Sequence, residues 1–137
     1  MSDFRVVIHR LPSPKLNTNT VSSKGSHWGT YAKAKKEDGE EAFDRARDQR
    51  LPKTIPWSDV SVNVHFVIPY VKSITVRDWD NLIGSTKGFW DGLVQAGVLA
   101  DDNMSVIQRI SFSHENKKMP KKGIGAETIF EITQLGA

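Results

Sequence analysis

The sequence predicts an α+β fold in a single domain, with one mixed sheet and helices packed on it. Apolar residues recur at every second position in four segments and at helical spacing in two others. In chain order these segments are strand, helix, strand, helix, strand, strand. The chain has 137 residues, of which 38% are hydrophobic, and this is enough to bury one core without a structural metal or disulfide. We therefore expect residues 1–137 to form one domain.

Four strands are predicted from the alternation. The clearest is Val60–Ile68, in which every second residue is apolar and which a proline follows. An earlier strand, Phe4–Arg10, ends at a Leu-Pro-Ser-Pro segment, whose prolines stop strand pairing. The last two strands, Val106–Phe112 and Glu127–Ile132, are joined by the basic segment Lys117–Gly125. We expect these two strands to pair as an antiparallel hairpin.

Two helices are predicted from the apolar spacing. The first is Thr30–Arg50, along which lysines and acids alternate, a pattern typical of a solvated helix face. Gly39 lies inside it and weakens it. The second runs from Asp80 to Val98, with Gly97 placed to cap its C-terminus.

The composition excludes several classes of protein. There is no cysteine, which rules out thiolate zinc sites and disulfide frameworks and fits a reducing cytoplasm. The N-terminus does not resemble a signal peptide, and the longest apolar run is too short to span a membrane. We therefore expect a cytoplasmic protein without membrane contact. The net charge of +3 and the pI of about 9.2 suggest a polyanionic partner.

Aspartates gather at the two ends of the second predicted helix. Asp78 and Asp80 stand one residue apart, where the chain passes from strand to helix. If the backbone is still extended there, both side chains point to the same side. Two carboxylates placed in this way can hold Mg²⁺ or Mn²⁺. Asp101 or Asp102 is the natural third ligand, provided that the chain folds back after the helix.

Each aspartate also has an ordinary structural interpretation. Asp80 fits the N-cap position of the helix. The segment Asp101–Asp102–Asn103 fits a turn. Asp91 stands four residues after Lys87, as in a helical ion pair. Composition and spacing alone leave the metal site and these structural roles open.

Taken together, these residues form a pattern of fixed spacing. The pattern comprises Asp78-Trp-Asp80-Asn81-Leu, Lys87-Gly-Phe-Trp-Asp91-Gly-Leu93, Ala96-Gly97-Val-Leu and Asp101-Asp102. It resembles that of the RusA-type Holliday junction resolvases (the endodeoxyribonuclease RusA family). That family has Asp-x-Asp-Asn-x-x-Lys-x-x-x-Asp-Ala-Leu, a glycine-ended helix, and Asp-Asp before a strand. The similarity extends weakly over nearly the whole chain.

The resemblance implies a Mg²⁺-dependent endodeoxyribonuclease, with Mn²⁺ as an alternative metal. Its substrate would be a four-way (Holliday) junction or related branched DNA, cleaved by paired phosphodiester hydrolysis during recombination and repair. Carried over by motif, the metal ligands are Asp78, Asp80 and Asp102, and the assisting catalytic lysine is Lys87. The second aspartate of the final pair is the matching one, so Asp101 is not counted. Family members are homodimers, and this chain is expected to be bacterial or phage-encoded.

One departure from the family pattern concerns the lysine. The family has it four residues after the second aspartate, where this chain has Gly84. Lys87 comes seven residues after Asp80, but its spacing to the later aspartates of the motif matches the family, so we align Lys87. Either the helix is continuous and the lysine is displaced by nearly one turn, or Gly84 and Ser85 form a small loop and the helix begins later.

Cations are needed to offset the repulsion between carboxylates and DNA phosphates. Arg77 directly precedes Asp78. The other candidate DNA-binding residues form a basic cluster: Lys117, Lys118, Lys121 and Lys122. Lys24, His27 and Trp28 also offer a mix that could meet phosphate and base, although an ordinary loop is the simpler interpretation.

Two alternative functions stay open at the level of the sequence. The first is a branched-DNA-binding protein on the same fold, catalytically weakened by the insertion before Lys87. The second is a metal-binding α+β domain with a small-molecule substrate, which the basic residues disfavour only mildly.

Overall fold

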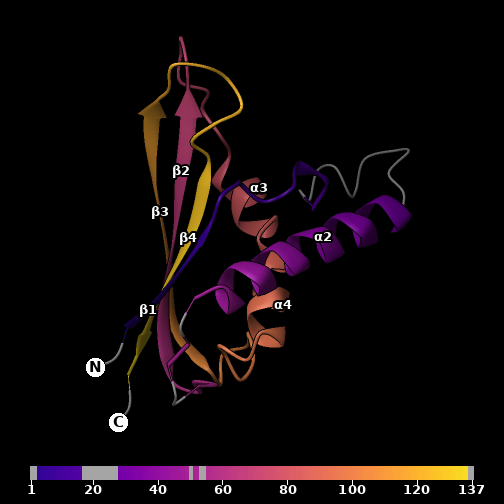
Figure 1. The fold of residues 1–137 in the computed structure, drawn as a ribbon, viewed down its shortest axis with the longest axis vertical. Coiled ribbons are helices and arrows are strands. Elements are labelled where there is room, and N and C mark those ends of the chain that lie inside the picture. Colours follow the sequence, from indigo (N-terminus) through magenta and orange to yellow (C-terminus); the bar gives the residue numbers. More distant parts are fainter. Residues whose placement is uncertain (1–2, 17–27, 50, 53–54, 136–137) are drawn as a thin grey trace.

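A computed structural model of the chain describes residues 3–16, 28–49, 51–52 and 55–135. It confirms the predicted α+β class, with a four-stranded mixed sheet whose helices lie on one side (Figure 1). The elements are β1 (Asp3–Ile8), the 3₁₀ turn η1 (Pro14–Leu16), α2 (Trp28–Arg47), β2 (Val60–Tyr70), α3 (Trp79–Gly84), α4 (Lys87–Gln95), β3 (Ile107–Lys118) and β4 (Glu127–Gln134). Within the described ranges, no helix combines the length and apolar character needed to cross a membrane. Lys24 and His27 lie outside these ranges, and so does the side chain of Trp28.

The pairing of the last two strands differs from the prediction. The sheet order is β1-β4-β2-β3, so β4 lies between β1 and β2 and is antiparallel to both. β3 pairs in parallel with β2 and is an edge strand. The predicted hairpin is therefore wrong, and the basic segment after β3 passes over the end of β2 to reach β4 (Figure 1). The difference follows from burial, because Ile129, Phe130 and Ile132 need a central position, whereas nearly all of β3 is exposed.

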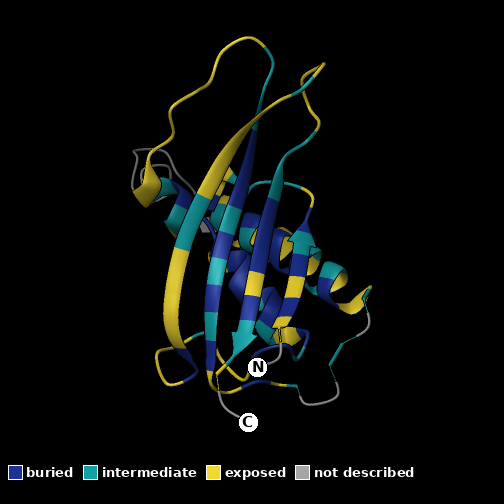
Figure 2. Ribbon diagram, turned by 90° about the vertical axis from the view of Figure 1, so that its left-hand side faces the viewer, coloured by how far each residue is buried: buried dark blue, intermediate teal, exposed yellow. Residues whose placement is uncertain are grey.

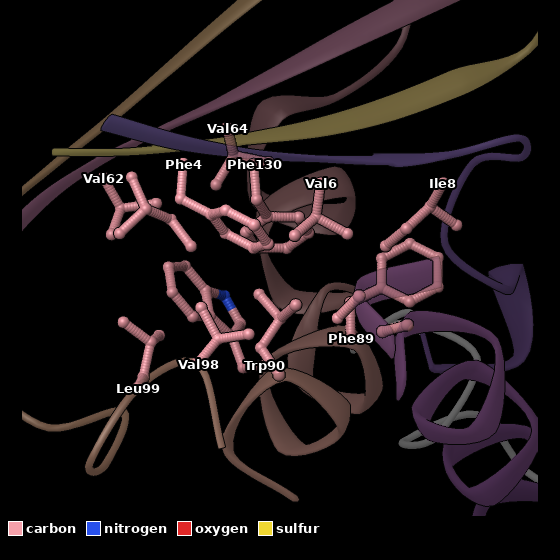
Figure 3. Close-up of a cluster of buried hydrophobic side chains, with 14 of the residues drawn as sticks. Phe4, Val6, Ile8, Val62, Val64, Phe89, Trp90, Val98, Leu99 and Phe130 are labelled. Carbon is pink, nitrogen blue, oxygen red and sulfur yellow. The ribbon is translucent and has the colours of Figure 1, made fainter. Parts of the chain in front are cut away.

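The core lies between the helices and one face of the sheet. Alternating side chains of β1, β2 and β4 meet apolar side chains of α4 and of the segment after it (Figure 3). Residues that meet in this core include Phe4, Val6, Ile8, Val62, Val64, Phe89, Trp90, Val98, Leu99 and Phe130. No helix in the described part of the chain covers the opposite face of the sheet, which carries many intermediate and exposed residues (Figure 2). His65 lies on that face, with its Nδ1 2.7 Å from Ser113 Oγ.

The second predicted helix is two helices. α3 ends at Gly84 and α4 begins at Lys87, so the structure has the later helix start that the sequence left open. The hydroxyl of Ser85 donates to the carbonyl of Asn81, and that of Thr86 donates to the carbonyl of Ile83, each at 2.7 Å. These bonds satisfy carbonyl groups of the last turn of α3, and the helix ends there.

Glycines allow α2 and α4 to pack with their backbones in contact. A Cβ atom added to Gly92 would overlap the carbonyl oxygen of Gly39, and one added to Gly88 would lie 2.7 Å from Asp38 Cβ. Gly39 was predicted only to weaken its helix. Its position against α4 gives it a second role, because this contact fixes where Lys87, the first residue of α4, lies relative to the rest of the domain.

We expect Gly92→Ala to lower the free energy of unfolding by about 2–3 kcal/mol, because the added methyl forces the two helices apart. Urea unfolding followed by circular dichroism measures this change. Gly39→Ala is the matched control, because its Cβ would lie 3.4 Å from the carbonyl oxygen of Gly88, an ordinary contact. Its effect should stay within about 1 kcal/mol, since alanine also favours the helix. Equal effects of the two substitutions would contradict this account of the packing.

An ion pair between a buried carboxylate and a partly exposed arginine holds the proline segment after β1 against α2. Asp38 is fully buried, and its Oδ1 lies 2.5 Å from Nη1 of Arg10. The backbone N–H of Ser13 donates to Asp38 Oδ2 at 2.9 Å. Burial raises the pKa of Asp38, and the contacts with Ser13 and Arg10 oppose that rise. The segment anchored in this way forms one wall of a cleft at the candidate site.

Candidate functional site

Asp78 and Asp80 lie at the start of α3. Asp78 is the N-cap, with an extended backbone, and its Oδ1 accepts a hydrogen bond from the backbone N–H of Asp80 at 3.1 Å. The structural interpretation of the sequence placed Asp80 at the N-cap, and this was wrong. The N-cap is Asp78. Because the chain is helical from Trp79 onward, strand alternation does not govern the direction of Asp80. Both aspartates are exposed, and neither forms an ion pair with a residue that the structure describes.

Lys87 joins the start of α4 to the segment that follows this helix. Its Nζ lies 2.8 Å from Oδ2 of Asp102 and 3.0 Å from Oδ1 of Asp91. The contact with Asp91 is the predicted helical ion pair. The contact with Asp102 spans 15 residues of sequence, so the chain does fold back after the helix. Lys87 and Asp102 are thus brought together, as the motif alignment requires.

The return of the chain is held by backbone hydrogen bonds. The N–H of Trp57 donates to the carbonyl of Val98, and the N–H of Ala100 donates to the carbonyl of Trp57, both at 3.0 Å. Gly97 has a φ of +82°, a conformation that glycine adopts without strain, and it turns the chain out of α4. These features place Asp102 alongside the helix.

Asp101 and Asn103 form the turn that presents Asp102. The backbone N–H of Asp102 donates to Oδ1 of Asp101 at 2.7 Å, and that of Ser105 donates to Oδ1 of Asn103 at 2.9 Å. The turn interpretation is therefore correct for Asp101 and Asn103. It does not account for the side chain of Asp102, which faces Lys87.

The charges at Lys87 stabilise one another. The hydrogen bonds to Asp102 and Asp91 raise the pKa of Lys87, so its ammonium stays charged. The hydrogen bond from Lys87 lowers the pKa of Asp102, so its carboxyl group is ionised at neutral pH. Sequence reasoning missed Lys35 of α2, whose Nζ lies 3.3 Å from Oδ2 of Asp91. Its place in an alternating charge run gave no signal of this contact.

The three candidate metal ligands do not form one cluster. Asp78, Asp80 and Asp102 offer carboxylate oxygens, which Mg²⁺ prefers as ligands. Their arrangement is a different matter. In the part of the chain that the structure describes, no group of three or more histidine, aspartate or glutamate side chains is close enough to hold a metal ion. The donor chemistry of the three carboxylates therefore fits Mg²⁺, although they do not form a preassembled cluster.

A cleft of about 410 Å³ opens beside Asp78. Arg77, Asp78 and Asn81 line one side, and the proline segment of Pro12 and Pro14 lines the other. Arg77, predicted to contact DNA, is therefore next to the first candidate ligand in space as well as in sequence.

Part of the basic cluster lines a second hollow, of about 500 Å³, at the end of the sheet. Lys121 and Lys122 lie on one side, and Lys72 from the segment after β2 lies on the other. The two sides are tied together by a 2.8 Å hydrogen bond from the N–H of Met119 to the carbonyl of Tyr70. Lys72 was missed from the sequence, because only the crossing of the basic segment over β2 brings it here. Lys117 and Lys118 are the last residues of β3 instead of loop residues, and both are exposed.

Comparison with known protein-family models gives no match for this chain, and comparison with curated proteins gives no significant one. The resemblance to RusA-type resolvases therefore stays a prediction that depends on the motif residues.

Proposed function

We propose that the protein is a Mg²⁺-dependent endodeoxyribonuclease that cleaves four-way junctions or related branched DNA during recombination and repair. The observation that carries this proposal is the 2.8 Å contact between Lys87 and Asp102. The two residues were assigned to one site from the motif alone. Their proximity supports the alignment of Lys87 and the choice of Asp102 over Asp101. We further propose that it acts in the cytoplasm of a bacterium or of a phage-infected cell.

The residues at Lys87 suit phosphodiester hydrolysis. A fixed, charged ammonium can stabilise the negative charge that develops on the phosphate oxygens in the transition state. The proposed cofactor, Mg²⁺ or Mn²⁺, would supply an activated water and neutralise charge on the leaving oxygen. Its proposed ligands are Asp78, Asp80 and Asp102. Two of them, Asp78 and Asp80, are exposed carboxylates that form no ion pair with a described residue, so their charge is open to a cation.

The proposal includes a homodimer, because a junction with two-fold symmetry requires two active sites for paired cuts. Cleavage of a supercoiled plasmid that carries a cruciform tests the dimer and the paired cuts in one assay. With Mg²⁺ present, a dimer that cuts twice in one binding event yields linear plasmid directly. Accumulation of nicked circles before linear product would contradict paired cleavage by a dimer.

A second candidate function is a branched-DNA-binding protein with weakened catalysis. It is favoured by the separation of the carboxylates, since no three potential metal ligands lie close enough together among the described residues to hold a metal ion. Tight, structure-selective junction binding without cleavage in Mg²⁺ or Mn²⁺ would decide for this alternative.

The hollow lined by lysines is proposed to hold the DNA backbone. We expect Lys121→Ala/Lys122→Ala to reduce the slope of log Kd against log salt concentration by about 1–2, because each phosphate contact contributes roughly 0.9. Fluorescence anisotropy with a labelled junction in EDTA measures the slope without cleavage. The control, Lys33→Ala/Lys36→Ala, removes the same charge from exposed positions on α2. If both pairs change the slope equally, the effect belongs to net charge and the hollow is not the DNA site.

A further inference from the structure

A third hollow, of about 320 Å³, lies between the segment after β2 and the edge strand β3. Ile74, Val76 and Trp79 give it an apolar wall, and His114 and Arg77 add polar groups. The three apolar side chains are exposed, Val76 at 93%. Exposed apolar groups gathered in one concave place indicate a binding surface more often than isolated ones do.

Trp79 packs against two other rings in this hollow. Its ring meets that of His114 edge-on, with ring centroids 5.4 Å apart and ring planes at 76°. Its ring centroid also lies 6.3 Å from that of Phe66. The side chain is nevertheless 39% exposed, because β3 is the edge strand beside it. The structure thus presents an oriented aromatic surface to solvent, at the residue between Asp78 and Asp80.

The hollow is continuous with the two sites already described. It shares Arg77 and Leu82 with the cleft beside Asp78, and Thr75 with the lysine-lined hollow. An aromatic surface therefore lies between a basic groove and the candidate catalytic carboxylates. This arrangement of positive charge beside an aromatic ring is complementary to a strand of nucleic acid. Its phosphates bind cationic side chains, and its bases stack on aromatic rings.

We propose that this hollow binds one unpaired nucleobase of branched DNA, stacked on Trp79, with Arg77 on a neighbouring phosphate. The inference depends on the proposed function and refines it, because it names what the site recognises at a branch point. Stacking requires only a π-face, so the site accepts any of the four bases. His114 fixes the Trp79 ring from the side and is a positioning residue.

Two labelled four-way junctions test the proposal in EDTA, one intact and one in which the nucleotides at the crossover lack their bases. The phosphate backbone is the same in both, so the ratio of the two Kd values reports contact with bases. We expect the wild-type protein to bind the intact junction roughly 5- to 150-fold more tightly, as for one stacked base. Trp79→Leu keeps an apolar side chain against Phe66 but should bring the ratio close to 1. Trp79→Phe should retain most of the preference.

The possible outcomes separate the inference from the proposed function. A wild-type ratio near 1 with tight, salt-dependent binding overturns the base site and leaves the proposed function standing. If Trp79→Leu still prefers the intact junction, the base site is overturned as well. If Trp79→Leu changes the sedimentation coefficient but not the ratio, the hollow is an interface between two copies of the chain. Failure of the wild-type protein to bind either junction overturns both the inference and the proposed function.

Discussion

Asp80→Asn should abolish cleavage of a four-way junction in Mg²⁺, with a loss of about 10³-fold or more in the single-turnover rate, whereas Kd for the junction changes less than about threefold. The substitution keeps the shape of the side chain and removes the negative charge that a metal ion requires. Asp80 is exposed and forms no ion pair with a described residue, so the fold should not depend on its charge. Gel analysis of cleavage products, together with anisotropy binding in EDTA, measures both quantities.

Asp101→Asn is the matched control for this prediction. Asp101 also belongs to the acidic motif, but its carboxylate forms the turn that presents Asp102. The Oδ1 of an asparagine can still accept the hydrogen bond from the N–H of Asp102, and only the bond from the side-chain amide of Asn103 to Oδ2 is lost. The variant should therefore cleave within about threefold of the wild-type rate. Loss of cleavage in Asp101→Asn with activity retained in Asp102→Asn would reverse the assignment of the third ligand. Undiminished cleavage by Asp80→Asn would remove this aspartate from the site.

The class of fold could be predicted because alternation and helical spacing are local properties of the sequence. Strand partners could not, since the same alternation in β3 and β4 suits a hairpin or two separate positions in the sheet. What separates the strands is the number of apolar residues. β4 has Ile129, Phe130 and Ile132 buried, whereas β3 buries only Ile107. The amount of apolar surface, used together with its period, would have indicated which strand is central.

The candidate site could be predicted in part for the same reason. The ion pair of Lys87 with Asp91 is local, so its spacing was sufficient. The contact with Asp102 depends on a turn at Gly97 and on backbone pairing with Trp57, neither of which spacing reveals. Lys35 and Lys72 were missed because only tertiary packing places them at the site. The position of α4 likewise depends on contacts between its glycines and α2. In the sequence of a single helix, such glycines only appear to weaken the helix.

Lys87→Ala should reduce the cleavage rate by about 10²–10³-fold, the usual effect of removing one group that stabilises transition-state charge. The structure strengthens this expectation, because the ammonium lies 2.8 Å from Asp102, a proposed metal ligand, and α4 begins at this residue. Near-normal cleavage would show that the family lysine has no counterpart at this position. Single-turnover rates at saturating protein separate this effect from a change in DNA affinity.

Lys35→Ala provides the control, because Lys35 forms an ion pair with Asp91 and none with Asp102. It removes a charge of the same sign from the same cluster, so general electrostatic attraction for DNA falls equally in the two variants. A large loss in Lys87→Ala with less than about a threefold loss in Lys35→Ala would therefore assign the effect to the ammonium beside Asp102. Lys87→Arg then distinguishes a requirement for positive charge from a requirement for the lysine ammonium itself. If it restores the rate, positive charge at this position is sufficient; if it does not, the reaction requires the compact ammonium that binds Asp91 and Asp102 together.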